Sequence, residues 1–157
     1  MAGRILAWHT VVIRLSYNRH TMVIHSHKDL EKLARLILAK KPRIIALSGL
    51  LGAGKTTLTK EIGKQLGIVE NIISPTYVLE TEYKIPGSKR LFVHIDCYRM
   101  ETVDELIRLG IKNRIKHQDI IVIEWADKFP YFFKKYSTTY INISLGEKEN
   151  ERIVEII

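Results

Sequence analysis

The chain has 157 residues, which suits one domain with a substantial core and excludes a separate substrate domain. With 46% hydrophobic and 27% charged residues, its composition is typical of a globular protein. The formal net charge of +8 favours acidic partners such as nucleic acid, or else only keeps the surface hydrated. No apolar run approaches the roughly 18 residues of a membrane span, so we expect no membrane partner. The single cysteine, Cys97, excludes an internal disulfide and favours a cytoplasmic location.

Residues 1–21 are predicted to be an N-terminal extension, either a strand-like arm or the product of a misplaced translation start. Its basic flanks and apolar middle are a little like a secretory signal, but no small-residue cleavage site follows. Met22 opens a clearer pattern, a strand over 22–25 followed by a helix over 26–41 that Ser26 caps. We therefore expect a single domain over 22–157.

The next segment carries the most informative motif, a P-loop over 49–56 with the sequence GLLGAGKT. An apolar stretch at 43–47 predicts a buried strand before it, and the spacing of apolar residues predicts a helix over 57–66 after it. In such a loop, glycines let successive N–H groups face phosphate oxygens, and the helix adds its positive dipole end. The side chain of Lys55 would reach the β- and γ-phosphates, and the Thr56 hydroxyl would bind Mg²⁺. The segment expected to bind ATP or ADP comprises Leu51, Gly52, Ala53, Gly54, Lys55, Thr56 and Thr57.

Strands and short helices alternate through the rest of the chain. The predicted elements are strands over 77–83 and 90–96 joined by a turn at 86–88, helices over 102–109, 111–116 and 129–136, a central strand over 119–124, and a closing hairpin of 138–145 and 151–157. This order predicts an α/β fold, a P-loop NTPase-like sandwich whose mixed, mainly parallel central sheet is flanked by helices.

Two carboxylates end predicted strands, Glu124 after the aliphatic run 120–123 and Asp96 after 91–95. Ligands of open α/β sheets bind beyond the carboxyl ends of the strands, so both side chains are candidate metal ligands and catalytic groups beside Lys55. One of them would hold Mg²⁺ while the other positions the attacking water, and the sequence leaves the division open. Both could instead be surface acids. His94, two residues before Asp96, is a candidate to tune that carboxylate.

Four blocks together resemble the TsaE family: Gly-Ala-Gly-Lys-Thr-Thr at 52–57, Ser-Pro-Thr-Tyr at 74–77, His-Ile-Asp-Cys-Tyr-Arg at 94–99 and Ile-Glu-Trp at 123–125. The family consists of small bacterial P-loop ATPases needed for the threonylcarbamoyladenosine modification at position 37 of ANN-decoding tRNAs. The resemblance covers about residues 22–157. It departs at Leu50, where members usually carry an acidic residue, and so an acidic contact from that position is not expected here.

The resemblance implies roles for individual residues. The Ser-Pro-Thr block is similar to a switch segment, so Thr76 becomes a candidate ligand near the γ-phosphate. Asp96 and Glu124 look like the metal-site and hydrolysis carboxylates, in line with the interpretation from strand ends. Trp125 would lie near the nucleotide or pack in the core. Tyr98 and Arg99 would face a partner protein or brace the switch segment.

The resemblance also implies a function and partners. It implies ATP hydrolysis that resets a TsaB–TsaD protein complex between catalytic cycles, with low activity of the isolated chain and only indirect or transient contact with tRNA. Two other classes stay open from the residues alone, a small nucleoside or nucleotide kinase and a binding module that does not hydrolyse nucleotide. The products formed from ATP distinguish these three classes.

Overall fold

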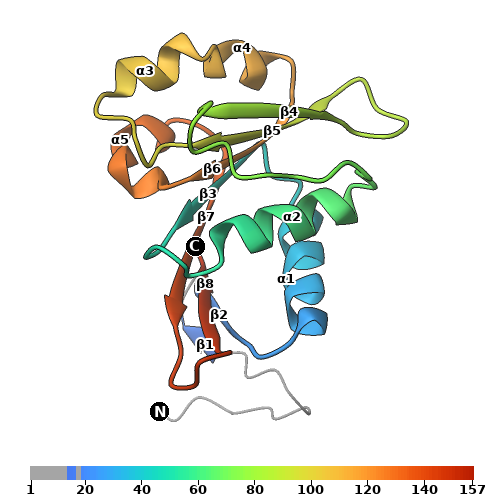
Figure 1. The fold of residues 1–157 in the computed structure, drawn as a ribbon, viewed down its shortest axis with the longest axis vertical. Helices are drawn as coiled ribbons and strands as arrows, with labels where there is room; N and C mark the ends of the chain where they lie inside the picture. Colours follow the sequence, from blue (N-terminus) through green and yellow to red (C-terminus); the bar gives the residue numbers. More distant parts are fainter. Residues whose placement is uncertain (1–13, 17–18) are drawn as a thin grey trace.

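The computed structural model describes residues 14–16 and 19–157 (Figure 1). Its strands form an eight-stranded sheet in the order β1-β2-β8-β7-β3-β6-β5-β4. The strands are β1 (Arg14–Ser16), β2 (Arg19–Ile24), β3 (Ile44–Ser48), β4 (Glu80–Lys84), β5 (Leu91–Asp96), β6 (Ile120–Glu124), β7 (Thr138–Leu145) and β8 (Arg152–Ile156). The helices are α1 (His27–Ala39), α2 (Lys55–Gln65), α3 (Val103–Arg108), α4 (Ile111–Lys116), the 3₁₀ turn η1 (Ala126–Lys128) and α5 (Pro130–Phe133).

The centre of the sheet is parallel and its margins are antiparallel. Strand β3 pairs in parallel with both β6 and β7, and β5 pairs in parallel with β6. The remaining strands add antiparallel pairs at both edges. The central strands β3 and β6 are almost wholly aliphatic because helices cover both of their faces. The predicted α/β fold with a mixed sheet flanked by helices is therefore confirmed.

Two separate hydrophobic cores hold the helices against the sheet. On one face, Leu33 of α1 and Leu58 of α2 pack with alternate residues of the central strands. On the other face, Leu106 of α3 and Phe133 of α5 pack with the intervening residues of the same strands. Figure 1 shows α1 and α2 to the right of the central strands and below β4 and β5, with α3 and α4 at the top and α5 at the left. With both faces covered, the carboxyl edge of the parallel strands is left for a ligand.

The N-terminal part of the sheet begins earlier than the sequence predicted. Strand β2 runs from Arg19 rather than Met22 and pairs with β8, with Met22 opposite Val154. Strand β1 pairs antiparallel with β2. Residues 14–16 and 19–21 of the predicted extension are thus part of the sheet, and residues 1–13 and 17–18 lie outside the described residues. The boundary proposed at Met22 stays a prediction.

The other differences concern element ends. The Ser26 cap is confirmed, since its side chain and that of Asp29 form a capping box at the start of α1. Strand β4 begins only at Glu80, because residues 76–78 form a turn that the Leu79 amide closes by donating to the Pro75 carbonyl. The helix predicted over 129–136 is shortened to the single turn α5. Within residues 14–16 and 19–157, no helix has the length and hydrophobicity to cross a membrane.

Candidate active site

The P-loop lies between β3 and α2, as predicted, and its three glycines all adopt positive φ angles. The φ angles are +139° at Gly49, +77° at Gly52 and +110° at Gly54. Residues with a Cβ rarely adopt such values. At Gly49 a Cβ would also collide with the carbonyl oxygen of Ile143 on β7. Gly54 caps α2 without a side chain, so the first amides of the helix remain available to an anion.

Lys55 begins α2, and contacts within the protein hold its side chain in place. Its Nζ donates to the carbonyl oxygens of Gly49 at 2.7 Å and Leu50 at 2.9 Å. It also lies 3.9 Å from the ring centroid of Trp125, in cation–π geometry. Burial lowers the pKa of Lys55, while the charges of Glu124 and Asp96 act in the opposite direction. The ammonium group is therefore ordered at the mouth of the P-loop.

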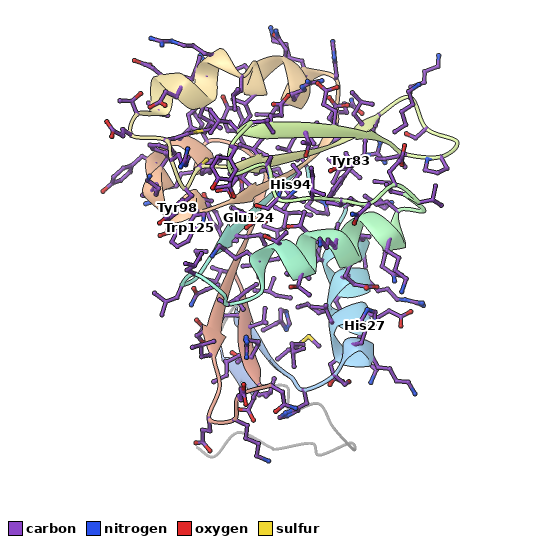
Figure 2. The ribbon with its side chains drawn as sticks, viewed as in Figure 1. His27, Tyr83, His94, Tyr98, Glu124 and Trp125 are labelled. Carbon is purple, nitrogen blue, oxygen red and sulfur yellow. The ribbon has the colours of Figure 1, made fainter. Side chains whose placement is uncertain are left out.

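Glu124 ends β6 and is buried, with both carboxylate oxygens occupied. Its Oε2 accepts from the Thr56 hydroxyl at 3.0 Å, and its Oε1 lies 2.8 Å from Nε2 of His94 on β5. His94 was predicted to act on Asp96, and this prediction is wrong, because the imidazole contacts the carboxylate of Glu124 on the neighbouring strand. Figure 2 shows His94 and Glu124 side by side between the sheet and α2.

Asp96 ends β5 opposite Glu124 in the strand register and holds the segment 74–79. Its Oδ2 accepts from the hydroxyls of Thr76 at 2.7 Å and Ser74 at 3.3 Å. Its Oδ1 accepts from the amide of Tyr98 at 2.8 Å, and its own amide donates to the Leu79 carbonyl. The carboxylate thus ties the candidate switch segment to the end of the sheet.

A cavity of about 270 Å³ brings the predicted residues together. It is lined by Leu51, Gly52, Gly54, Lys55, Thr56, Thr57, Ser74, Thr76, Asp96, Tyr98, Glu124 and Trp125. Of the predicted nucleotide and metal residues, only Ala53 is outside this lining, because its side chain is buried in the core below the loop. Two carboxylates and a hydroxyl beside a phosphate-binding loop are the donor set that Mg²⁺ uses. The residues present therefore fit this ion.

Trp125 and Arg99 occupy positions that the sequence left open. Trp125 is half-buried, lines the cavity and also packs against the core on its other side. Its ring centroid lies 5.0 Å from that of Tyr98, and Figure 2 shows the two rings together. The guanidinium carbon of Arg99 lies 4.6 Å from the ring centroid of Tyr77, so this side chain braces the 74–79 segment.

A second cavity, of about 350 Å³, lies on the other side of the P-loop and was missed by sequence reasoning. Its walls are largely apolar, with Leu30 of α1 and Val154 of β8 among them, and Ser26 and Arg152 add polar groups. Arg152 Nε donates to the carbonyl oxygen of Ala53 at 3.1 Å, across 99 residues of sequence. No motif marks this cavity, because its walls come from three distant segments. An apolar pocket with a few polar groups suits part of a small ligand.

Comparisons with known proteins found matches to one family. The model of the family "Threonylcarbamoyl adenosine biosynthesis protein TsaE" matches residues 24–154. The chain is 39% identical to the tRNA threonylcarbamoyladenosine biosynthesis protein TsaE of Haemophilus influenzae over 62% of this chain and 63% of that protein. It is 42% identical to the protein of the same name from Nostoc over 65% of this chain and 61% of that protein. The matched region thus spans about three fifths of these relatives.

A solved structure supports the architecture independently. The crystal structure of Bacillus subtilis YdiB superposes with a TM-score of 0.67 and covers 95% of this chain and 87% of that one, at 24% identity. At this identity the likeness shows the fold alone. The family match, by contrast, includes the P-loop and both strand ends that carry the carboxylates. The chain belongs to the TsaE family of threonylcarbamoyl adenosine biosynthesis proteins.

Proposed function

We propose that this protein is a Mg²⁺-dependent ATPase that acts in the tRNA threonylcarbamoyladenosine pathway. The observation that carries the proposal is the single cavity in which Lys55 and Thr56 of the P-loop face Asp96 and Glu124. Family membership supplies the pathway, because the curated relatives are named for biosynthesis of this modified nucleoside.

Binding of the triphosphate is assigned to the P-loop side of the cavity. The amides of the loop and of the first turn of α2 would receive the phosphate oxygens, and Lys55 would exchange its two carbonyl partners for phosphate. The apolar cavity on the other side of the loop would take the base, with Arg152 at its edge. Two different surfaces of one loop would thus hold the two ends of the nucleotide.

The hydrolytic step is assigned to the two strand-end carboxylates. Thr56 with Asp96 or Glu124 would hold Mg²⁺, which neutralises charge on the phosphate oxygens when bound. The other carboxylate would orient a water molecule in line with the bond to the γ-phosphate. Because Thr76 is hydrogen-bonded to Asp96, loss of the γ-phosphate would change the contacts of the 74–79 segment as well.

A protein partner is expected to complete the site. No arginine lines the phosphate cavity in the described part of the chain, although such a group stabilises the transition state in many P-loop enzymes. Large apolar side chains are exposed around its mouth: Leu50, Leu51, Tyr77, Val78 and Tyr98. We assign this surface to docking of a TsaB–TsaD pair, with tRNA contacting this chain indirectly or transiently.

The kinase alternative draws little support from the structure. A kinase lid would place several basic side chains over the phosphate cavity. The basic helix α4 instead packs beyond β4, where Arg114 contacts Glu80 and Glu82. No residue of α4 lines the phosphate cavity.

Phosphate release from ATP and Mg²⁺ tests the proposal, measured for the purified chain alone and with a TsaB–TsaD pair. We expect slow turnover alone and marked stimulation by the pair. Lys55→Ala should weaken ATP binding by more than about a hundredfold, because about 3 kcal/mol of charge-assisted contacts is lost. Lys60→Ala, an exposed change on the same helix, should bind normally. Phosphorylated nucleoside as product would instead establish a kinase, and binding without turnover in either setting would establish a binding module.

A further inference from the structure

We propose that His94 is a positioning residue that fixes the carboxylate of Glu124 in the orientation needed for ATP hydrolysis. The inference rests on the proposed ATPase function and adds a residue to it. His94 lies on β5, completely buried, and its Nε2 is 2.8 Å from Glu124 Oε1. A hydrogen on Nε2 that points at this carboxylate oxygen makes the imidazole the donor.

The contacts of Glu124 show why a positioning group is needed. A glutamate side chain has three rotatable bonds, and here it ends between β6, β5 and the start of α2. The Thr56 hydroxyl holds only Oε2 and would itself be needed by the metal ion. His94 holds the other oxygen, so the carboxylate keeps its direction when Thr56 changes partner. Removal of a hydrogen bond of this kind to a metal-site group commonly lowers metal affinity or activity about 10- to 100-fold.

The surroundings of His94 argue against a role in packing alone. Phe92 lies on the same face of β5, two residues earlier, and fills the core with an apolar ring. At position 94 the chain buries a polar ring instead, and within residues 14–16 and 19–157 its Nδ1 has no hydrogen-bond partner. Leaving that nitrogen unpaired costs free energy, which an apolar side chain would avoid. The bond to Glu124 is the contact that compensates for this cost.

Two substitutions separate positioning from packing. The amide nitrogen of Gln stands as many bonds from Cβ as Nε2 of histidine does, whereas the Asn amide is one bond shorter. We expect His94→Gln to keep kcat within about threefold of the wild type and His94→Asn to lower it about 10- to 100-fold. The KM for ATP should stay within about threefold in both proteins, because neither substitution touches the P-loop. If His94→Asn does not fold, His94→Leu, which fills the buried space without a donor, takes its place.

Crystal structures of both variants supply a readout that does not depend on turnover. In His94→Gln the Glu124 carboxylate should keep its place beside Thr56, and in His94→Asn it should turn away. Phe92→Leu is the matched control, since it should lower the melting temperature with no change in kcat. Equal kcat values for the Gln and Asn proteins, or an unmoved carboxylate in the Asn protein, would overturn the proposal. If the wild type hydrolyses no ATP, the proposed function fails, and the crystal structures still decide whether His94 orients Glu124.

Discussion

The two sides of the P-loop are built on different principles. On the side of β5 and β6, charged and hydroxyl groups satisfy one another: Lys55 with loop carbonyls, Glu124 with Thr56, and Asp96 with Thr76. On the side of α1 and β8, the cavity walls are mostly apolar. Stabilising the charge that develops on a phosphate requires a few polar groups at defined positions. A base, in contrast, is bound mainly through the apolar surface that it buries. Substitutions of the strand-end carboxylates on the first side should therefore change kcat, and substitutions on the second side should change the Kd for ATP.

The strongest test of this difference is Glu124→Gln. The change keeps the shape of the side chain but removes its charge, and so kcat should fall by about a hundredfold or more. The Kd for ATP should stay within a few-fold, because the P-loop contacts remain. Single-turnover kinetics and equilibrium titration measure the two quantities separately. Asp127→Asn, an exposed change three residues along the chain, serves as the control. Normal hydrolysis by the Gln protein would remove Glu124 from the mechanism.

A smaller effect is expected on the other side of the loop. Arg152→Ala removes the hydrogen bond to the Ala53 carbonyl and a polar group at the edge of the apolar cavity. The Kd for ATP should rise about three- to tenfold, with kcat at saturating ATP unchanged, since about 1 kcal/mol of binding is lost. Lys148→Ala removes the same charge from an exposed position of the same hairpin and should have no effect. A drop in kcat with Arg152→Ala would mean that the two sides do not act separately.

The smallest effect concerns the core beneath the carboxylates. Burial raises the pKa of the Cys97 thiol from 9.0 to about 12. The unfolded chain therefore loses this proton first, and the free energy of unfolding should fall as pH rises between about 9 and 12. The slope approaches about 1.4 kcal/mol per pH unit for one group. Denaturant unfolding at pH 8, 9 and 10 should show this loss relative to Cys97→Ala. Parallel curves for the two proteins would mean that the thiol is not buried in a dry core.

The side of the P-loop that faces β5 and β6 could be predicted from the sequence because its determinants are local. The P-loop is a contiguous motif, and the aliphatic run before Glu124 can belong only to a strand or helix buried on all sides. Parallel pairing then brings the ends of β5 and β6 to one edge, which places Asp96 opposite Glu124. The only long-range information needed to predict Asp96 and Glu124 as site residues is that their two strands are neighbours in the sheet.

The features that the sequence did not predict depend on contacts between distant segments. Tyr77 and Val78 have high strand propensity, yet they lie in a turn, because hydrogen bonds from Thr76 to Asp96 and from Leu79 to Pro75 outweigh that propensity. The apolar cavity arises only when α1, the P-loop and β8 meet. The pairing of His94 with Glu124 depends on the register between β5 and β6. Local patterns carry no signal for any of these features.

The glycines of the P-loop are required for two unrelated reasons. A Cβ at Gly52 would meet none of the described residues within 4 Å, so glycine there serves only the positive backbone angle of the loop. A Cβ at Gly49 would collide with the carbonyl oxygen of Ile143, in the strand beside β3. Selection for nucleotide binding alone would preserve the glycine at position 52. Selection for assembly of the sheet would preserve the one at position 49 even in a descendant that bound no nucleotide.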